Sequence, residues 1–195
     1  MSADEPAMGR QSGFFDRAPI LETARLTLRP FRAGDMAANA ATLADPEVVR
    51  HLGGTPLSRE DSWRRLLTAA GLWTLLGYGY WSVERRADGV WLGQIGFGDF
   101  KRDMTPSIEG LPEMGWVFAP QGQGQGYATE AAVAALAWAD AALGAQEIVA
   151  IIAPENAASI RVAEKTGFED CSEARYRDER ILLFRRRAPA ESPTA

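Results

Sequence analysis

The chain has 195 residues, a formal net charge of −5 and 46% hydrophobic residues, values that are ordinary for one globular domain. The negative charge argues against a general nucleic-acid binder, and no apolar run reaches the roughly 18–20 residues that a membrane-spanning helix needs. The single cysteine, Cys171, excludes an intramolecular disulfide and suits a reducing compartment. We therefore expect a cytoplasmic protein whose partners include neither nucleic acid nor a membrane.

The two ends of the chain differ in composition from its middle. Residues 1–18 mix glycine, serine, proline and charged residues without periodicity, and residues 188–195 are rich in alanine and proline. Such composition predicts a mobile N-terminal arm and a disordered C-terminal tail. Residues 19–187 contain no linker and no internal repeat, so they are expected to form one domain.

The first half of the chain predicts a strand, three helices and a β-hairpin. Residues 25–31 alternate in polarity as a strand does. Typical capping residues precede three helical stretches: Asp35 before a helix to about Leu43, Asp45-Pro46 before a short helix, and Ser58 before a longer one. Two strand-like runs, 78–86 and 90–100, are joined by Ala87-Asp88-Gly89, a strong hairpin signal.

The second half alternates strands and helices more regularly. The expected strands are residues 113–118, 147–153 and 181–184, and the expected helices are residues 127–143 and 156–165. The full order of elements predicts an α/β or α+β domain around a mixed, mostly antiparallel sheet.

The most informative segment is the glycine-rich loop between the strand at 113–118 and the helix that begins at Tyr127. Gly122, Gly124 and Gly126 stand at every second position, so backbone N–H groups there can point toward a ligand. The N-terminus of the next helix adds a partial positive charge that suits a phosphate. A flexible turn before a helix is the alternative explanation.

Two familiar nucleotide-binding motifs do not fit this loop. The dinucleotide motif G-x-G-x-x-G fails because the third glycine falls one position early, and the next strand ends in Ala153-Pro154 without an acidic ribose ligand. A P-loop fails because no lysine follows the glycines.

The segment Gln123-Gly-Gln-Gly-Tyr-Ala128 fits the pattern Q-x-x-G-x-A, and a second segment runs from Asn156 through a helix to Gly167-Phe168. Both resemble the GNAT superfamily of acyl-CoA-dependent N-acyltransferases, in the order that the superfamily shows. The opening Arg25-Leu-Thr-Leu-Arg-Pro-Phe31 is similar to the branch that contains the ribosomal-protein N-terminal acetyltransferases. The resemblance covers roughly residues 21–187.

The resemblance implies a fold and a cofactor site. The fold is a mixed sheet flanked by helices, in which the strands at 113–118 and 147–153 splay apart. The co-substrate is acetyl-CoA, with no metal. The pyrophosphate would be held by the backbone of the loop residues Gln123, Gly124, Gln125, Gly126, Tyr127 and Ala128. Asn156 and Ser159 of the second segment would make further contacts with the cofactor. An N–H group near Val117 or Phe118 would bind the thioester oxygen.

Amide formation also needs a general base, for which Glu113 is the preferred candidate. It begins the strand that would carry the acyl group, and it shares a strand face with Gly115 and Val117. The carboxylates of Asp178 and Glu179, before the last strand, are the second choice. Glu130 is more consistent with a role in complementing the helix dipole.

The proton donor for the leaving thiolate departs from the wider pattern of the superfamily. Many members carry a tyrosine seven residues after the asparagine of the second segment, whereas this chain has Ala163. The ribosomal branch has a serine three residues after that asparagine, which corresponds here to Ser159. A hydroxyl can bond to the CoA sulfur and pass on a proton. Tyr176 is the alternative donor.

These features predict acetyl transfer to a primary amine by direct attack in a ternary complex, with a small molecule or a peptide as acceptor and a monomer or homodimer as the active unit. Two alternatives stay open: a catalytically silent CoA-binding or regulatory module, which Ala163 makes conceivable, and another transferase that uses a phosphorylated ligand. His51, the only histidine, has no Cys, His or acidic cluster at ligand spacing, so no metal site is expected.

Overall fold

The computed structural model describes residues 18–188, so the predicted arm at 1–18 and tail at 188–195 lie almost entirely outside the described residues. The described strands are β1 (Leu21–Glu22), β2 (Leu26–Arg29), β3 (Tyr80–Arg85), β4 (Trp91–Gly98), β5 (Met104–Thr105), β6 (Glu113–Phe118), β7 (Glu147–Ile152), β8 (Asp170–Tyr176) and β9 (Glu179–Arg187). The α-helices are α1 (Met36–Leu43), α2 (Pro46–Val49), α3 (Arg59–Leu76), α4 (Tyr127–Ala142) and α5 (Ala157–Lys165).

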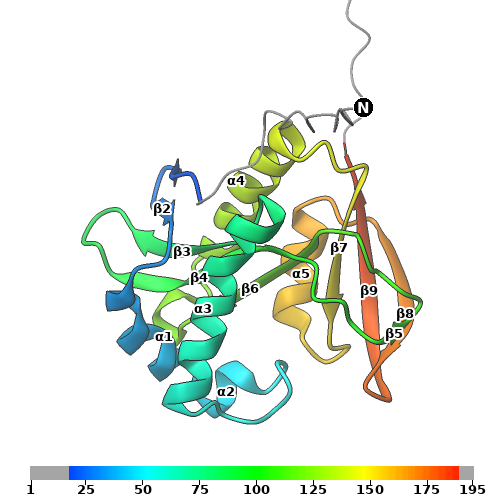
Figure 1. The fold of residues 1–195 in the computed structure, drawn as a ribbon, viewed down its shortest axis with the longest axis horizontal. Coiled ribbons are helices and arrows are strands. Elements are labelled where there is room, and N and C mark those ends of the chain that lie inside the picture. Colours follow the sequence, from blue (N-terminus) through cyan, green and yellow to red (C-terminus); the bar gives the residue numbers. More distant parts are fainter. Residues whose placement is uncertain (1–17, 189–195) are drawn as a thin grey trace, which may run out of the picture.

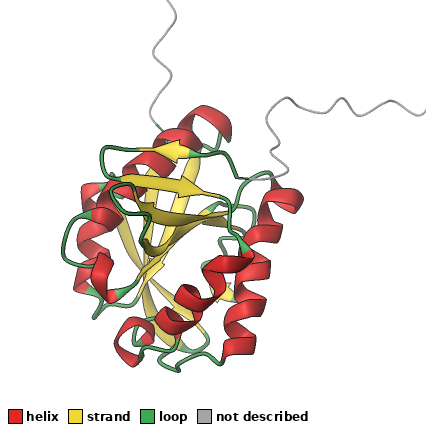
Figure 2. Ribbon diagram, turned by 90° about the vertical axis from the view of Figure 1, so that its left-hand side faces the viewer, coloured by secondary structure: helices red, strands yellow, loops and turns green. Residues whose placement is uncertain are grey.

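The strands of the described chain form one sheet in the order β1-β2-β3-β4-β6-β7-β9-β8-β5. Every neighbouring pair is antiparallel except β6 and β7, which are parallel. Helices lie on both sides of the sheet (Figure 2). The predicted fold class, a mixed and mostly antiparallel sheet flanked by helices, is confirmed.

The parallel pair β6 and β7 splays apart almost as soon as it forms. Their ladder contains a single pair of partners, Glu113 with Val149, supported by a bond from the Val149 N–H to the Pro112 carbonyl (3.0 Å). By contrast, β4 follows β6 for six residue pairs and β9 follows β7 for six. Beyond Glu113 the facing edges of both strands therefore have backbone groups that no strand pairing satisfies.

The two faces of the sheet are covered by different helices. The main core includes Ala131, Ala135 and Leu136 of α4, packed with buried residues of the central strands. On β6, Val117 packs instead with Leu43 and Val49, which belong to α1 and α2. Figure 1 shows α1, α2 and α3 gathered on one side of the molecule, with β8, β9 and β5 at the other. Alternate residues of β6 thus face the α1–α3 side, the face on which Glu113 also lies.

Local signals set most of the helix starts. The Ser58 hydroxyl accepts a bond from the Asp61 N–H (3.1 Å) at the start of α3, and the Asp45 carboxylate accepts one from the Glu47 N–H (2.9 Å) at the start of α2. The prediction for Asp35 is wrong in its detail. Its carboxylate makes no capping bond to α1, because it is held by the Arg29 guanidinium (2.7 and 2.8 Å) and the Arg32 N–H.

Three strands were not predicted. β8 pairs with β9 over seven residues, but only Ala174 among its residues is buried, so its sequence lacks the apolar alternation of a strand. β1 and β5 have two residues each, too few to give a pattern. Their structure is imposed by the neighbouring strands rather than by their own sequences.

Candidate active site

A cleft of about 570 Å³ lies where β6 and β7 separate. Its lining residues come from β6, β7 and α5, from α3, from the loop after β4 and from the β8–β9 turn. The cleft brings together six of the candidate site residues predicted from the sequence, namely Glu113, Val117, Asn156, Ser159, Tyr176 and Glu179. Phe118 and the loop from Gln123 to Ala128 are not among its lining residues.

The glycine loop has a shape that requires glycine at two positions. Gly124 and Gly126 have φ values of +73° and +78°, in the left-handed region that side chains with a Cβ rarely adopt. Gly126 is the N-cap of α4, and the first helical bond runs from the Glu130 N–H to its carbonyl (3.0 Å). Within residues 18–188, the N–H groups of residues 124–128 form no hydrogen bond. They are donors for an anion.

The glutamine side chains of the loop are used inside the protein. The Gln123 carboxamide donates to the Phe118 carbonyl (2.8 Å), and the Gln125 carboxamide donates to the Gln121 carbonyl (2.9 Å). Both bonds hold the loop against the end of β6 and the short turn after it. The ligand-facing donors are consequently the backbone N–H groups, as the spacing of the glycines predicts.

Arg25 and Glu130 brace the loop from the side of β2. The Arg25 guanidinium lies 4.4 Å from the centre of the Tyr127 ring and donates to the Gln125 carbonyl (3.0 Å). Glu130 accepts bonds from the Thr23 hydroxyl (2.6 Å) and the Arg25 Nε (2.6 Å). Burial alone would raise the Glu130 pKa, but the hydrogen bonds from Thr23 and Arg25 lower it. Glu130 therefore ties α4 to the β1–β2 segment, a role beyond the dipole effect predicted for it.

The start of α5 presents a hydroxyl to the cleft. Asn156 is the N-cap, and its side-chain oxygen accepts a bond from the Ser159 N–H (3.1 Å). The Ser159 side chain is half-buried, and in the described chain its hydroxyl forms no hydrogen bond. Ala163 is fully buried in the main core, so its position offers no proton to a ligand.

Glu113 is buried and paired. Arg102, in the loop after β4, donates from Nε (2.5 Å) and Nη2 (2.8 Å) to the two oxygens of the Glu113 carboxylate. The Arg102 guanidinium also lies 5.0 Å from the Phe100 ring centre and 4.9 Å from that of Tyr176. No sequence pattern predicts this pair, because Arg102 lies in an irregular loop eleven residues before Glu113.

The other candidate acid and base lie around the β8–β9 turn. Tyr176 ends β8, is half-buried, and its ring contacts both Arg102 and Arg177 (5.1 Å). Glu179, the first residue of β9, lines the cleft, whereas Asp178 does not. Asp178 has a φ of +64° in the turn between the two strands. The structure thus brings Tyr176 and Glu179 near Glu113, and leaves Asp178 outside the lining.

Two further lining residues were not predicted. Tyr80, in β3, and Gln94, in β4, line the floor of the cleft beside β6. The Gln94 side chain is 3% exposed. An ideal Cβ placed on Gly115 would lie 2.4 Å from the Tyr80 hydroxyl oxygen, so the tyrosine reaches across β4 to lie over β6. The only signal in the sequence is Gly115, which leaves room for the Tyr80 hydroxyl where the strands pair.

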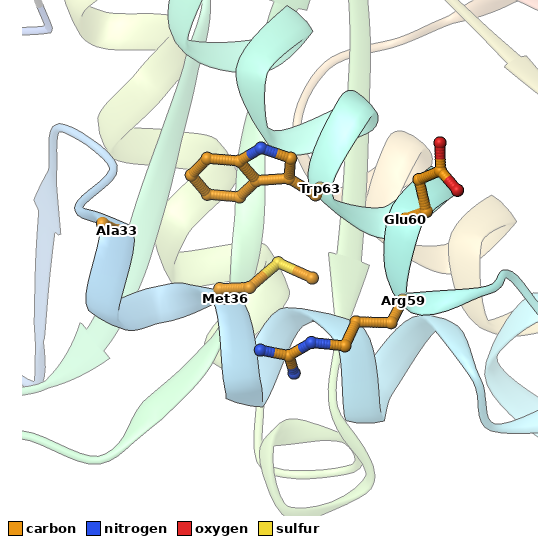
Figure 3. Close-up of a pocket in the computed structure, with 5 residues that line it drawn as sticks. All are labelled: Ala33, Met36, Arg59, Glu60 and Trp63. Atoms are coloured by element: carbon orange, nitrogen blue, oxygen red, sulfur yellow. The ribbon is translucent and has the colours of Figure 1, made fainter.

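Two further features of the described chain are its histidine and a second depression. His51 lines the cleft, but no group of three or more His, Cys, Asp or Glu side chains in the described residues could hold a metal ion. A second depression, between α1 and α3, is lined by Ala33, Met36 and Trp63 with the charged Arg59 and Glu60 at its rim (Figure 3). It contains none of the predicted site residues.

No helix among residues 18–188 is long and apolar enough to span a membrane.

Three features together are those of an acetyltransferase. They are the splayed parallel pair in an otherwise antiparallel sheet, the anion-binding loop at the start of α4 and the hydroxyl at the start of α5. Residues 25–169 match the family model described as "Acetyltransferase (GNAT) domain". The chain belongs to this family and is an N-acetyltransferase.

Individual relatives agree with this assignment. The chain is 31% identical over 152 residues to the uncharacterized N-acetyltransferase YoaA of Bacillus subtilis (strain 168), covering 77% of this chain and 83% of YoaA. An acetyltransferase from Agrobacterium tumefaciens str. C58 aligns with a TM-score of 0.74 and 31% identity, over 91% of this chain and 98% of that one. RimL, a ribosomal L7/L12 α-N-protein acetyltransferase in complex with coenzyme A, shares the fold at 17% identity and a TM-score of 0.69, over 89% of this chain and 100% of that one.

Proposed function

We propose that the chain transfers the acetyl group to a primary amine by direct attack in a ternary complex in the cytoplasm. The observation that carries the proposal is the set of unbonded N–H groups at residues 124–128, in a loop whose φ values favour glycine. In this proposal these groups hold the CoA pyrophosphate, and the pantetheine arm enters between β6 and β7. The acceptor is a small molecule or a peptide, and residues 19–187 act as one domain.

The thioester oxygen is assigned to a backbone N–H of β6. Backbone N–H groups along a strand alternate between its two neighbours, and the Ala119 N–H donates toward β4, to the Leu92 carbonyl (2.8 Å). The alternation therefore directs the Phe118 N–H toward β7, into the separation between the strands. Of the two donors predicted from the sequence, this reasoning favours Phe118 over Val117. Such a donor stabilises the negative charge of the tetrahedral intermediate.

The proton transfers are assigned to side chains of the cleft. Glu113, held by Arg102, accepts the proton of the amine through water, and Glu179 is the second candidate. Ser159 bonds to the CoA sulfur and protonates the leaving thiolate, with Tyr176 as the alternative donor. Asn156 supports this arrangement by fixing the backbone at Ser159.

A more specific proposal places the chain near the ribosomal-protein N-terminal acetyltransferases. It rests on the opening from Arg25 to Phe31 and on the serine at 159. Many GNAT proteins instead carry a tyrosine at the position that Ala163 occupies here. The likeness to RimL supports the fold alone.

Thermal-shift measurements with acetyl-CoA, ATP and NAD test the cofactor assignment. We expect acetyl-CoA to raise the melting temperature in a saturable way, because a ligand that binds only the folded state stabilises it. ATP or NAD giving an equal or larger shift would refute the proposed cofactor.

A further inference from the structure

The floor of the cleft contains two polar side chains that have no partner in the protein. Within residues 18–188, neither the Gln94 carboxamide nor the Tyr80 hydroxyl forms a hydrogen bond, although Gln94 is 97% buried. The buried side-chain polar atoms without a partner in the described chain are Arg29 Nε, Asn39 Oδ1 and Ser62 Oγ. The polar atoms of Tyr80 and Gln94 are therefore open to the cleft, where such groups bond to water or to a ligand. Both side chains are lining residues of the cleft, and a ligand there can satisfy them.

The strand register places these groups beside the reacting strand. Tyr80 pairs with Gly96, which in turn pairs with Gly115, and Gln94 pairs with Val117. Because Gly115 has no side chain, the Tyr80 hydroxyl lies over β6 between Glu113 and Val117. Burial raises the pKa of Tyr80, and the charge of Glu113 raises it further, so the hydroxyl stays protonated and acts as a donor.

The charges around the floor do not suit a second ammonium group. The Glu113 carboxylate is occupied by Arg102, which bonds to both of its oxygens. Arg65 and Arg177 also line the cleft, and among the described residues neither forms a salt bridge. Glu179 is the one lining carboxylate that is left without a described salt bridge. A diamine would bring its second positive charge close to several guanidinium groups.

We infer that Tyr80 and Gln94 bind the acceptor, which carries a neutral hydrogen-bonding group, a carboxamide, carbonyl or hydroxyl, beside its amine. The Gln94 carboxamide both donates and accepts, and the Tyr80 hydroxyl donates, so together they match such a group. Polyamines lack it. This inference rests on the proposed function, because it concerns the amine that the acetyl group reaches.

Alaninamide and 1,2-diaminopropane form a matched pair for the test, since the second replaces the carboxamide of the first with an aminomethyl group. The readout is the ratio of their kcat/KM values, compared between wild type and variants. This comparison cancels the difference in the neutral fractions of the two amines. Dissociation constants of each amine for the CoA-loaded protein give the same ratio without turnover.

We expect Tyr80→Phe and Gln94→Leu each to weaken the preference for alaninamide. The kcat/KM for alaninamide divided by that for the diamine should fall about five- to tenfold, the usual effect of losing one hydrogen bond. Gln94→Glu supplies a free carboxylate and should shift the ratio toward the diamine by about tenfold or more. Tyr78→Phe is the matched control, because Tyr78 packs against the core and does not line the cleft. It should leave the ratio unchanged.

Ratios that stay at the wild-type value in both Tyr80→Phe and Gln94→Leu would overturn the inference. So would failure of the CoA-loaded wild type to bind alaninamide. Binding of acetyl-CoA to the wild-type protein separates this result from failure of the proposed function, because the cradle is remote from the substituted side chains. If acetyl-CoA does not bind, the proposed function fails first.

Discussion

Replacing Gly126 tests the cofactor cradle through backbone conformation alone. Its φ of +78° lies in the left-handed region, and the nearest atom to an added Cβ would be the Arg25 Nη2 at 3.6 Å, an ordinary contact. Valine therefore fits the space but not the conformation. For a β-branched residue, holding this conformation costs about 2 kcal/mol. If the loop without CoA relaxes to relieve that strain, CoA must bring it back to the left-handed conformation on binding. The affinity for CoA then falls about 30-fold.

Gly144→Val is the matched control. Gly144 has a φ of +59°, no atom lies within 4 Å of its ideal Cβ, and it follows the opposite end of α4. Its substitution should lower the melting temperature without changing the dissociation constant for CoA, measured by calorimetry. Gly126→Asn should keep most of the affinity, because asparagine tolerates the left-handed region. If Gly126→Val loses stability as Gly144→Val does but binds CoA as the wild type does, the cradle assignment is wrong.

Three further predictions concern proton transfer and pH. Ser159→Ala should lower kcat by about 10–100-fold with CoA affinity nearly unchanged, and loss of turnover in Tyr176→Phe alone would move the acid role to Tyr176. Glu113→Gln should lower kcat/KM most at pH values where the amine is protonated, with a smaller defect at high pH; a defect confined to KM at every pH would assign Glu113 to acceptor binding. Glu130 has a lowered pKa, so its contribution to stability is present above the ordinary glutamate pKa and is lost as pH falls. Chemical denaturation from pH 7 to pH 3 should show a flatter loss in Glu130→Gln, and equal slopes would contradict the brace.

The parts of the fold that were predictable are those with strong local signals. The strand at 113–118 agrees with β6 at both ends, and Ser58 and Asn156 cap helices as their sequences indicate. The three glycines and the helix after them predict the anion-binding loop. In each case the information lies within a few residues of the chain, in periodicity, capping and turn chemistry.

The parts that could not be predicted depend on partners distant in the sequence. Glu130 accepts a hydrogen bond from Arg25, more than 100 positions away. Asp35 accepts hydrogen bonds from Arg29 instead of capping the helix that follows it. The Glu113–Arg102 pair depends on the path of an irregular loop. The position of Tyr80 over Gly115 requires the register of three strands, which no local pattern specifies.

The most direct test of the central claim is to follow the acetyl group itself. The purified protein would be incubated with acetyl-CoA labelled in the acetyl group and with a panel of primary amines that includes alaninamide. Thiol release and labelled amides would be quantified together, by colorimetry and mass spectrometry. Direct transfer predicts protein-dependent thiol release that is matched one to one by N-acetylated amine. Thiol release without any acetylated amine would contradict the assignment of this chain as an amine acetyltransferase.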